Sequence, residues 1–156
     1  MDFAQGQTGV RELTLTRVYD EPREVVFRAW TDPRLLAKWW GPEGFVSRVC
    51  EVDARPGGRL RIDMEGPDGT VYPNRGVFHE VNVPERLVFS TFFQDDAGNV
   101  EMEERTTVVF EDLGRRTKLT VRTAVVKCVP ELLDMLQGLE TGWLQTLDRL
   151  ARELTA

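Results

Sequence analysis

The sequence predicts an α+β protein in which a seven-stranded, curved antiparallel sheet is combined with a long C-terminal helix. Two observations indicate this class. Seven runs are rich in β-branched and aromatic residues, and the final segment repeats apolar residues at helical spacing. The 156 residues are 41% hydrophobic and 29% charged, so the chain can bury a substantial core. No linker, repeat or low-complexity tract divides residues 1–156, which are therefore expected to form one domain.

The first strand is expected after a loose N-terminal segment of residues 1–11. Residues 12–19, ELTLTRVY, alternate in side-chain character and carry β-branched and aromatic residues, which is typical of a strand. Two short helices are then expected within residues 22–40. Pro22 and Pro33 both fit the first position of a helix, where the missing N–H group of proline costs nothing.

Trp39 and Trp40 lie side by side where the second short helix is about to end. Thr31 or Asp32 can cap the start of this helix, and the glycine and proline after the tryptophans end it. Adjacent helical positions point about 100° apart, so the two rings cannot face the same way. One ring is expected to pack in the core and the other to cap part of the open end of the sheet. The alternative is that Trp40 belongs to the mouth of a pocket, with Gly41 and Gly44 as hinges of a mobile turn.

Five turn signals divide the middle of the chain into an antiparallel meander. They are RPGG (55–58), GPDG (66–69), VPER (83–86), DDAGN (95–99) and DLGRR (112–116). The six predicted strands are residues 45–54, 59–65, 70–82, 87–93, 101–111 and 117–126. Connections this short favour pairing between strands that follow one another in the chain.

The C-terminal segment, residues 130–154, is predicted to be one helix that begins at a proline and carries a continuous apolar stripe. At 1.5 Å per residue such a helix is about 36 Å long, enough to cross the sheet. One helix about 10 Å wide cannot fill the concave side of a curved sheet, so a cavity is expected between them. Gly138 and Gly142 indicate either a closely packed strand or space for a ligand.

Alternation along the strands predicts which side chains face this cavity. Glu104 shares a face with Met102 and Val108, and the only histidine, His79, shares a face with Val77. A buried carboxylate needs a partner, so Glu104 is expected to pair with an arginine or to turn towards the rim. The predicted ligand-binding residues are Trp40, His79, Phe93, Met102, Glu104, Thr106, Val121, Thr123, Met135, Leu139 and Trp143.

The charge of the chain argues against nucleic acid or an anionic membrane as a partner. The 26 acidic and 20 basic residues give a net charge of −6, and no Lys/Arg-rich run is present. No apolar stretch approaches the roughly 20 residues that span a bilayer, and the N-terminus has no signal-peptide pattern. A cytoplasmic location is expected.

Neither a metal nor a cofactor is expected. Cys50 and Cys128 lie far apart, and with a single histidine they cannot complete a usual tetrahedral zinc site. Both are expected to be small buried residues with free thiols, although a disulfide between them is not excluded. No nucleophile elbow, phosphate-binding glycine loop or dinucleotide fingerprint occurs in the sequence.

Several segments, in this order, resemble a known family. They include AWTDP (29–33), WWGP (39–42), RPGG (55–58) and PDG (67–69). The chain is similar, from residue 12 onward, to bacterial single-domain proteins related to the C-terminal domain of the activator of heat-shock-chaperone ATPase. These belong to the START-like, or SRPBCC, superfamily. The resemblance implies a helix-grip fold, in which the sheet wraps around the C-terminal helix. It supplies no catalytic motif that transfers residue by residue.

Three hypotheses on function follow. Superfamily members carry lipids, hormones or polyketides, so the first is binding of a small apolar or aromatic molecule between the sheet and the C-terminal helix, by a monomer or a homodimer. The second is an enzyme of the cyclase or hydratase kind that uses His79 and Glu104 as an acid/base pair, which requires both side chains to enter one pocket. The third is contact with a chaperone, the role of the eukaryotic namesake. A binding protein without catalysis is favoured.

Overall fold

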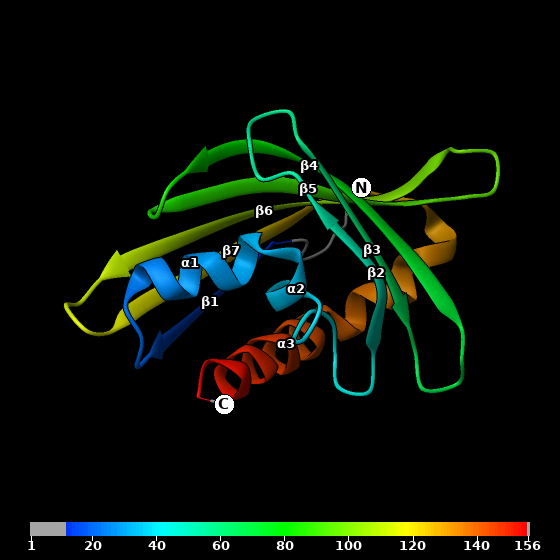
Figure 1. Ribbon diagram of the computed structural model, residues 1–156. Coiled ribbons are helices and arrows are strands. Elements are labelled where there is room, and N and C mark those ends of the chain that lie inside the picture. Colours follow the sequence, from blue (N-terminus) through cyan, green and yellow to red (C-terminus); the bar gives the residue numbers. More distant parts are fainter. Residues whose placement is uncertain (1–11, 156) are drawn as a thin grey trace.

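The computed structural model describes residues 12–155 and confirms the predicted α+β class and the predicted order of elements (Figure 1). The predicted loose segment 1–11 lies outside the described residues. The elements are β1 (Glu12–Tyr19), α1 (Arg23–Thr31), α2 (Pro33–Leu36), β2 (Val46–Val52), β3 (Arg59–Glu65), β4 (Val71–Asn82), β5 (Arg86–Gln94), β6 (Val100–Asp112), β7 (Thr117–Cys128), the 3₁₀ helix η1 (Pro130–Gly138) and α3 (Leu139–Leu154).

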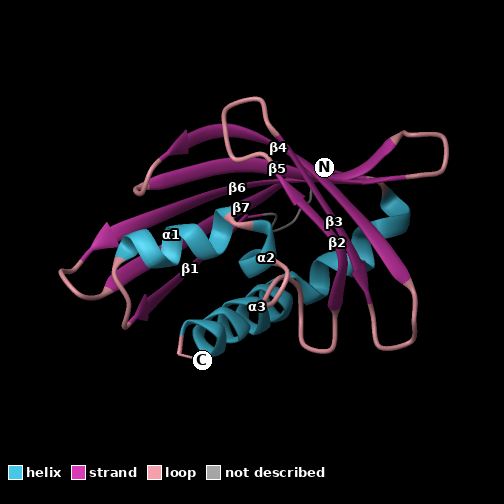
Figure 2. Cartoon of the chain, viewed as in Figure 1, coloured by secondary structure: helices cyan, strands magenta, loops and turns pink. Residues whose placement is uncertain are grey.

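The seven strands form one antiparallel sheet in the order β1-β7-β6-β5-β4-β3-β2. The predicted meander from β2 to β7 is therefore confirmed. β1 pairs with β7 rather than with β2, and Leu13 lies opposite Thr123. The segment with α1 and α2 carries the chain from β1 at one edge to β2 at the other (Figure 2). The two short helices consequently cross the same side of the sheet as α3 (Figure 1).

The helices α1 and α2 place the tryptophans against the sheet. α1 packs against β6 and buries Phe27 and Trp30, among others. At the start of α2 the carboxylate of Asp32 accepts a hydrogen bond of 2.9 Å from the backbone N–H of Arg34, which stabilises the helix terminus and lowers the pKa of Asp32. Asp32 is thus the cap, and not Thr31.

The prediction of one continuous helix over residues 130–154 needs a correction. Residues Pro130–Gly138 form the 3₁₀ helix η1, and only Leu139–Leu154 are α-helical, a length of about 24 Å. No side chain of η1 is buried, whereas α3 buries Trp143 and Leu147 among others. Packing of an apolar face supplies most of the stability of a helix, so the part without it lacks the support for regular α-helix. Gly138, a poor helix former, lies at the junction.

Within residues 12–155 no helix has the length and apolar character needed to cross a bilayer. In the same range, no group of three or more His, Cys, Asp or Glu residues could hold a metal ion. No disulfide joins Cys50 to Cys128. Burial raises the pKa of the Cys50 thiol to about 11, so this thiol is protonated and unreactive at neutral pH.

Candidate ligand-binding cavity

A cavity of about 340 Å³ lies between the sheet and the C-terminal helices. This volume falls within the range of small-molecule sites, which are about 300 to 1,000 Å³. Its wall comes from the segment after α2, from strands β3 to β6, and from η1 and α3. The lining residues are Trp40, Gly41, Pro42, Phe45, Met64, Tyr72, Asn74, Phe89, Thr91, Phe93, Met102, Glu104, Met135, Leu136, Gly138, Leu139, Gly142, Trp143 and Thr146. Most of them are apolar or aromatic.

The four tryptophans form one aromatic cluster at the side of this cavity. The ring centroid of Trp30 lies 4.8 Å from that of Trp39, 6.3 Å from that of Trp40 and 6.4 Å from that of Trp143. Trp40 and Trp143 line the cavity and meet edge to face at 5.9 Å. Trp30 and Trp39 lie behind them in the core. Such edge-to-face pairs are a preferred geometry of aromatic rings, so the wall is rigid where these rings form it.

Glu104 places a partly buried carboxyl group in the wall of the cavity. Its Oε2 accepts hydrogen bonds from the Trp143 Nε1–H at 2.8 Å and from the Thr123 hydroxyl at 2.6 Å. Burial raises the pKa of Glu104, and the two hydrogen bonds oppose this shift only in part. The partners are an indole and a hydroxyl, so the expectation that Glu104 pairs with an arginine is wrong.

A chain of hydrogen bonds behind the wall fixes the Glu104 carboxyl. The hydroxyl oxygens of Thr106 and Thr123 lie 2.8 Å apart. Since Thr123 has one hydroxyl hydrogen and donates it to Glu104, the Thr106 hydroxyl must donate to Thr123. Thr106 and Thr123 are fully buried and do not line the cavity. They orient the carboxyl from behind and do not touch the space where a ligand would lie.

The structure brings together seven of the eleven predicted ligand-binding residues. Those in the wall are Trp40, Phe93, Met102, Glu104, Met135, Leu139 and Trp143, and those outside it are His79, Thr106, Val121 and Thr123. Among the lining residues outside the predicted set, Phe89 and Thr91 share one face of β5 with the predicted residue Phe93, and strand alternation indicates this inward face from the sequence. Asn74, on β4, gave no comparable signal because its apolar neighbours are interrupted by proline and glycine.

The prediction that His79 faces the interior is wrong. Asn74 and Phe78 are the buried residues of β4, so alternation places His79 on the outer face, at a β-bulge where the register against β5 shifts between Phe78 and Glu80. Its side chain is exposed, and its Nε2 lies 2.7 Å from the hydroxyl oxygen of Ser90. Because Glu104 lines the cavity and His79 does not, the proposed acid/base pair does not converge on one substrate.

The two glycines of the C-terminal segment leave space beside the cavity. A Cβ atom built on Gly138 would meet no atom within 4 Å, and one on Gly142 would meet only Pro42, at an ordinary 3.7 Å. Neither glycine is therefore required by a closely packed strand. Both line the cavity, so of the two explanations that the sequence left open, the structure favours free space.

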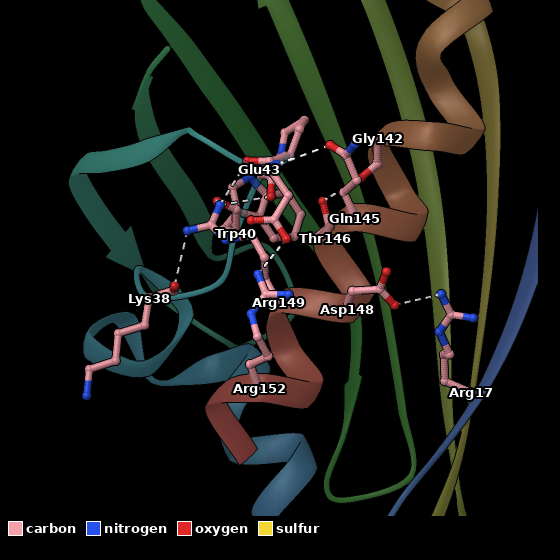
Figure 3. Close-up of polar contacts among 12 residues, drawn as sticks. Arg17, Lys38, Trp40, Glu43, Gly142, Gln145, Thr146, Asp148, Arg149 and Arg152 are labelled. Carbon is pink, nitrogen blue, oxygen red and sulfur yellow. Dashed lines mark hydrogen bonds and ion pairs between the residues drawn. The ribbon is translucent and has the colours of Figure 1, made fainter. Parts of the chain in front are cut away.

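Side chains of α3 form hydrogen bonds to residues 38–43, in the segment that follows α2 (Figure 3). The Nη1 group of Arg149 donates hydrogen bonds to the carbonyl oxygens of Trp40, Gly41 and Pro42 at 2.9 to 3.1 Å, and Nη2 donates to that of Lys38 at 3.2 Å. Burial lowers the pKa of Arg149. One guanidinium thus satisfies four carbonyl groups at the cavity border.

Replacing Arg149 by methionine is expected to lower the free energy of unfolding by about 2 kcal/mol. The variant keeps the apolar stem but leaves partly buried carbonyl groups without a charged donor, and such bonds contribute about 1.5 to 3 kcal/mol. Urea unfolding measures the change. Arg152→Met is the matched control, because its ion pair with Glu43 is exposed and is expected to contribute less than about 1 kcal/mol. Equal losses in the two variants would contradict the assigned role of Arg149.

A curved sheet that holds a C-terminal helix around an apolar cavity defines a helix-grip, or START-like, protein. The chain belongs to the family of Activator of Hsp90 ATPase homolog 1-like proteins, whose family model matches residues 20–155. The comparison with curated proteins gave no match.

Solved structures of bacterial proteins share this fold along nearly the whole chain. A protein from Chromobacterium violaceum is 30% identical with a TM-score of 0.78, and the match covers 91% of this chain and 96% of that one. A protein from Arthrobacter aurescens is 26% identical with a TM-score of 0.82, covering 94% and 87%. A protein from Nitrosomonas europaea is 27% identical with a TM-score of 0.77, covering 93% and 94%. These matches confirm the resemblance and the helix-grip fold predicted from the sequence.

Proposed function

We propose that the protein binds a small apolar or aromatic molecule in the cavity between the sheet and the C-terminal helices. The observation that carries this proposal is the 340 Å³ space itself, walled mostly by apolar and aromatic side chains. Protein interiors are normally packed to a density of about 0.75, with few voids larger than a water molecule. At that density the space accepts about 250 Å³ of molecular volume, the size of a compound with a few rings.

The border of the cavity supports entry of such a molecule. Met135 of η1 lines the cavity and is 44% exposed, and Leu136 beside it is partly exposed. Methionine side chains are flexible and adapt to different apolar surfaces. A short 3₁₀ helix without a buried side chain is also less firmly held than the rest of the fold, and binding loops are drawn from such regions. Entry past η1 therefore requires little loss of packing.

The proposal is tested with the neutral fluorescent probe N-phenyl-1-naphthylamine and a variant that fills the cavity. Thr91 points into the cavity from β5, and Thr91→Phe places a ring in that space. Thr107→Phe is the matched control, since Thr107 belongs to the opposite face of the sheet on β6 and does not line the cavity. The wild type and Thr107→Phe are expected to bind the probe equally, and Thr91→Phe at least tenfold more weakly.

Two results would contradict the proposal. One is a wild-type protein that does not bind the probe. The other is a Thr91→Phe variant that binds the probe as well as the wild type does, because binding would then occur elsewhere. Circular dichroism of the variants, recorded before the titrations, shows that each has the fold of the wild type.

A further inference from the structure

Three polar side chains form a row across the sheet side of the cavity, whose wall also contains Tyr72 and Thr146 but is otherwise apolar or glycine. They are Glu104 on β6, Thr91 on β5 and Asn74 on β4, and all three line the cavity. Thr91 lies directly opposite Glu104 in the register of β5 and β6. On the other side Thr91 lies opposite Gly76, two residues from Asn74 on the same face of β4. We call these three residues the polar row.

The polar row contains hydrogen-bonding groups that the protein does not satisfy. Asn74 is only 5% exposed, and its Oδ1 is buried without a hydrogen-bond partner. Glu104 receives both of its hydrogen bonds on Oε2, which leaves its partly exposed Oε1 without a protein partner among residues 12–155. A buried polar group such as the Asn74 Oδ1 costs about 1 to 3 kcal/mol when it has no partner, and each such group in a folded protein calls for an explanation. A ligand that forms hydrogen bonds with the polar row would explain why these groups have no partner in the protein.

The cavity contains no positive charge to receive an anion. Of the described residues, none of those that line it is lysine, arginine or histidine. A carboxylate ligand would place a second acid beside Glu104 in an apolar space without a compensating cation, which is unfavourable. The wall therefore selects against fatty acids and other carboxylates, although its apolar area would suit their chains.

The chemistry of the row points to one kind of polar group on the ligand. Thr91 and the amide nitrogen of Asn74 donate hydrogen bonds, while the oxygens of Asn74 and Glu104 accept them. A hydroxyl group both donates and accepts, so it satisfies both kinds of partner. A carbonyl group only accepts, and it would leave the acceptor oxygens of the row without a donor.

Building on the proposed function, we infer that the ligand is an uncharged apolar molecule that carries a hydroxyl group, such as a phenol or an alcohol, and that this hydroxyl lies against Asn74, Thr91 and Glu104. The apolar body of the ligand then packs on the rings of Trp40, Phe89 and Trp143, which line the same space. This arrangement gives the cavity its specificity, because apolar packing alone discriminates poorly between molecules of similar shape.

The inference is tested at pH 7 with naphthalene compounds that share one apolar body. The probes are 2-naphthalenemethanol, 2-methylnaphthalene, 2-naphthoate and 2-naphthalenemethylamine, titrated by calorimetry. The wild type is expected to bind the alcohol about tenfold more tightly than 2-methylnaphthalene, the gain from satisfying a buried polar site. The naphthoate anion and the charged amine are both expected to bind more weakly than the alcohol.

Variants of the polar row test whether these residues cause the preference for the alcohol over 2-methylnaphthalene. Thr91→Val and Asn74→Leu keep approximate shape but remove the hydrogen-bonding groups. Each is expected to reduce the preference for the alcohol over 2-methylnaphthalene at least threefold. If either variant fails to fold, the relative affinities of the wild type for the four compounds still test the inference.

The outcomes separate this inference from the proposed function. If no compound of the series binds, the proposed function fails together with the inference. If 2-methylnaphthalene binds as tightly as the alcohol, or if the naphthoate or the amine binds most tightly, the inference is overturned while the cavity remains a binding site. A preference for the alcohol that persists unchanged in both folded variants also overturns it, because the hydroxyl would then lie elsewhere.

Discussion

Replacing Trp39 by alanine is expected to lower the free energy of unfolding by about 3 to 5 kcal/mol, the usual cost of deleting a large buried aromatic side chain. Trp39 is completely buried, and its ring packs edge to face against Trp30 at 4.8 Å. Its Nε1–H also donates a hydrogen bond of 3.0 Å to the carbonyl oxygen of Ala29 at the end of α1. The variant therefore loses packing and leaves a buried acceptor without a partner. Urea unfolding measures the change.

Trp40→Ala provides the matched comparison, because it removes the same side chain one position further along. Part of the Trp40 ring faces the cavity, where no protein atoms pack against it. Fewer contacts are lost there, so the loss of stability is expected to be at least about 1 kcal/mol smaller than in Trp39→Ala. A loss below about 1 kcal/mol for Trp39→Ala, or a larger loss for Trp40→Ala, would contradict the assignment of Trp39 to the core and Trp40 to the wall.

The strands and helices were largely predictable because their signals are local. Turn residues and alternation predicted the meander, and Pro33 after a capping residue, Thr31 or Asp32, predicted the start of α2. The pairing of β1 with β7 was not predicted, because no local signal records which edge of a sheet an isolated strand joins. The change from α-helix to 3₁₀ helix at Gly138 was also missed, since the apolar stripe runs through both segments and only the packing differs.

The candidate site was predictable only where strand alternation continues without interruption. On β6 the alternation correctly indicates that Met102 and Glu104 face inward. On β4 Asn74 and Phe78 are the buried residues, so alternation places Val77 and His79 on the outer face. The bulge between Phe78 and Glu80 then shifts the pattern by one residue, which hides the true inward face in the sequence. Sequence position also cannot separate a side chain that lines a cavity from one that is packed behind it, and Thr106 and Thr123 are examples of the second kind. Those distinctions depend on the curvature of the sheet.

Glu104 is expected to make the wild type less stable as the pH rises. Burial raises its pKa in the folded protein above the value in the unfolded chain. Between these two pKa values the folded state retains a proton that the unfolded state has released. The free energy of unfolding therefore falls as pH increases from about 4.3, the ordinary glutamate pKa, up to the raised folded pKa, and is lower by a constant amount above it. A tenfold difference in the acid dissociation constant between the two states corresponds to about 1.4 kcal/mol.

Glu104→Gln isolates this effect, because the glutamine oxygen still accepts the hydrogen bonds from Trp143 and Thr123 but does not titrate. Urea unfolding of both proteins at intervals from pH 4 to pH 8 is expected to show the wild type losing stability relative to Glu104→Gln as the pH rises. Glu65→Gln is expected to give the opposite sign when the series is extended below pH 4. The hydrogen bond from Arg48 lowers the pKa of Glu65, so stability that depends on its charge is lost as the pH falls from the ordinary glutamate pKa towards the lowered one. A constant difference between the wild type and Glu104→Gln across this range would show that the Glu104 carboxyl is solvated as well in the folded state as in the unfolded chain. The wall of the cavity would then be wet at that point, and the apolar surroundings assigned to it would be wrong.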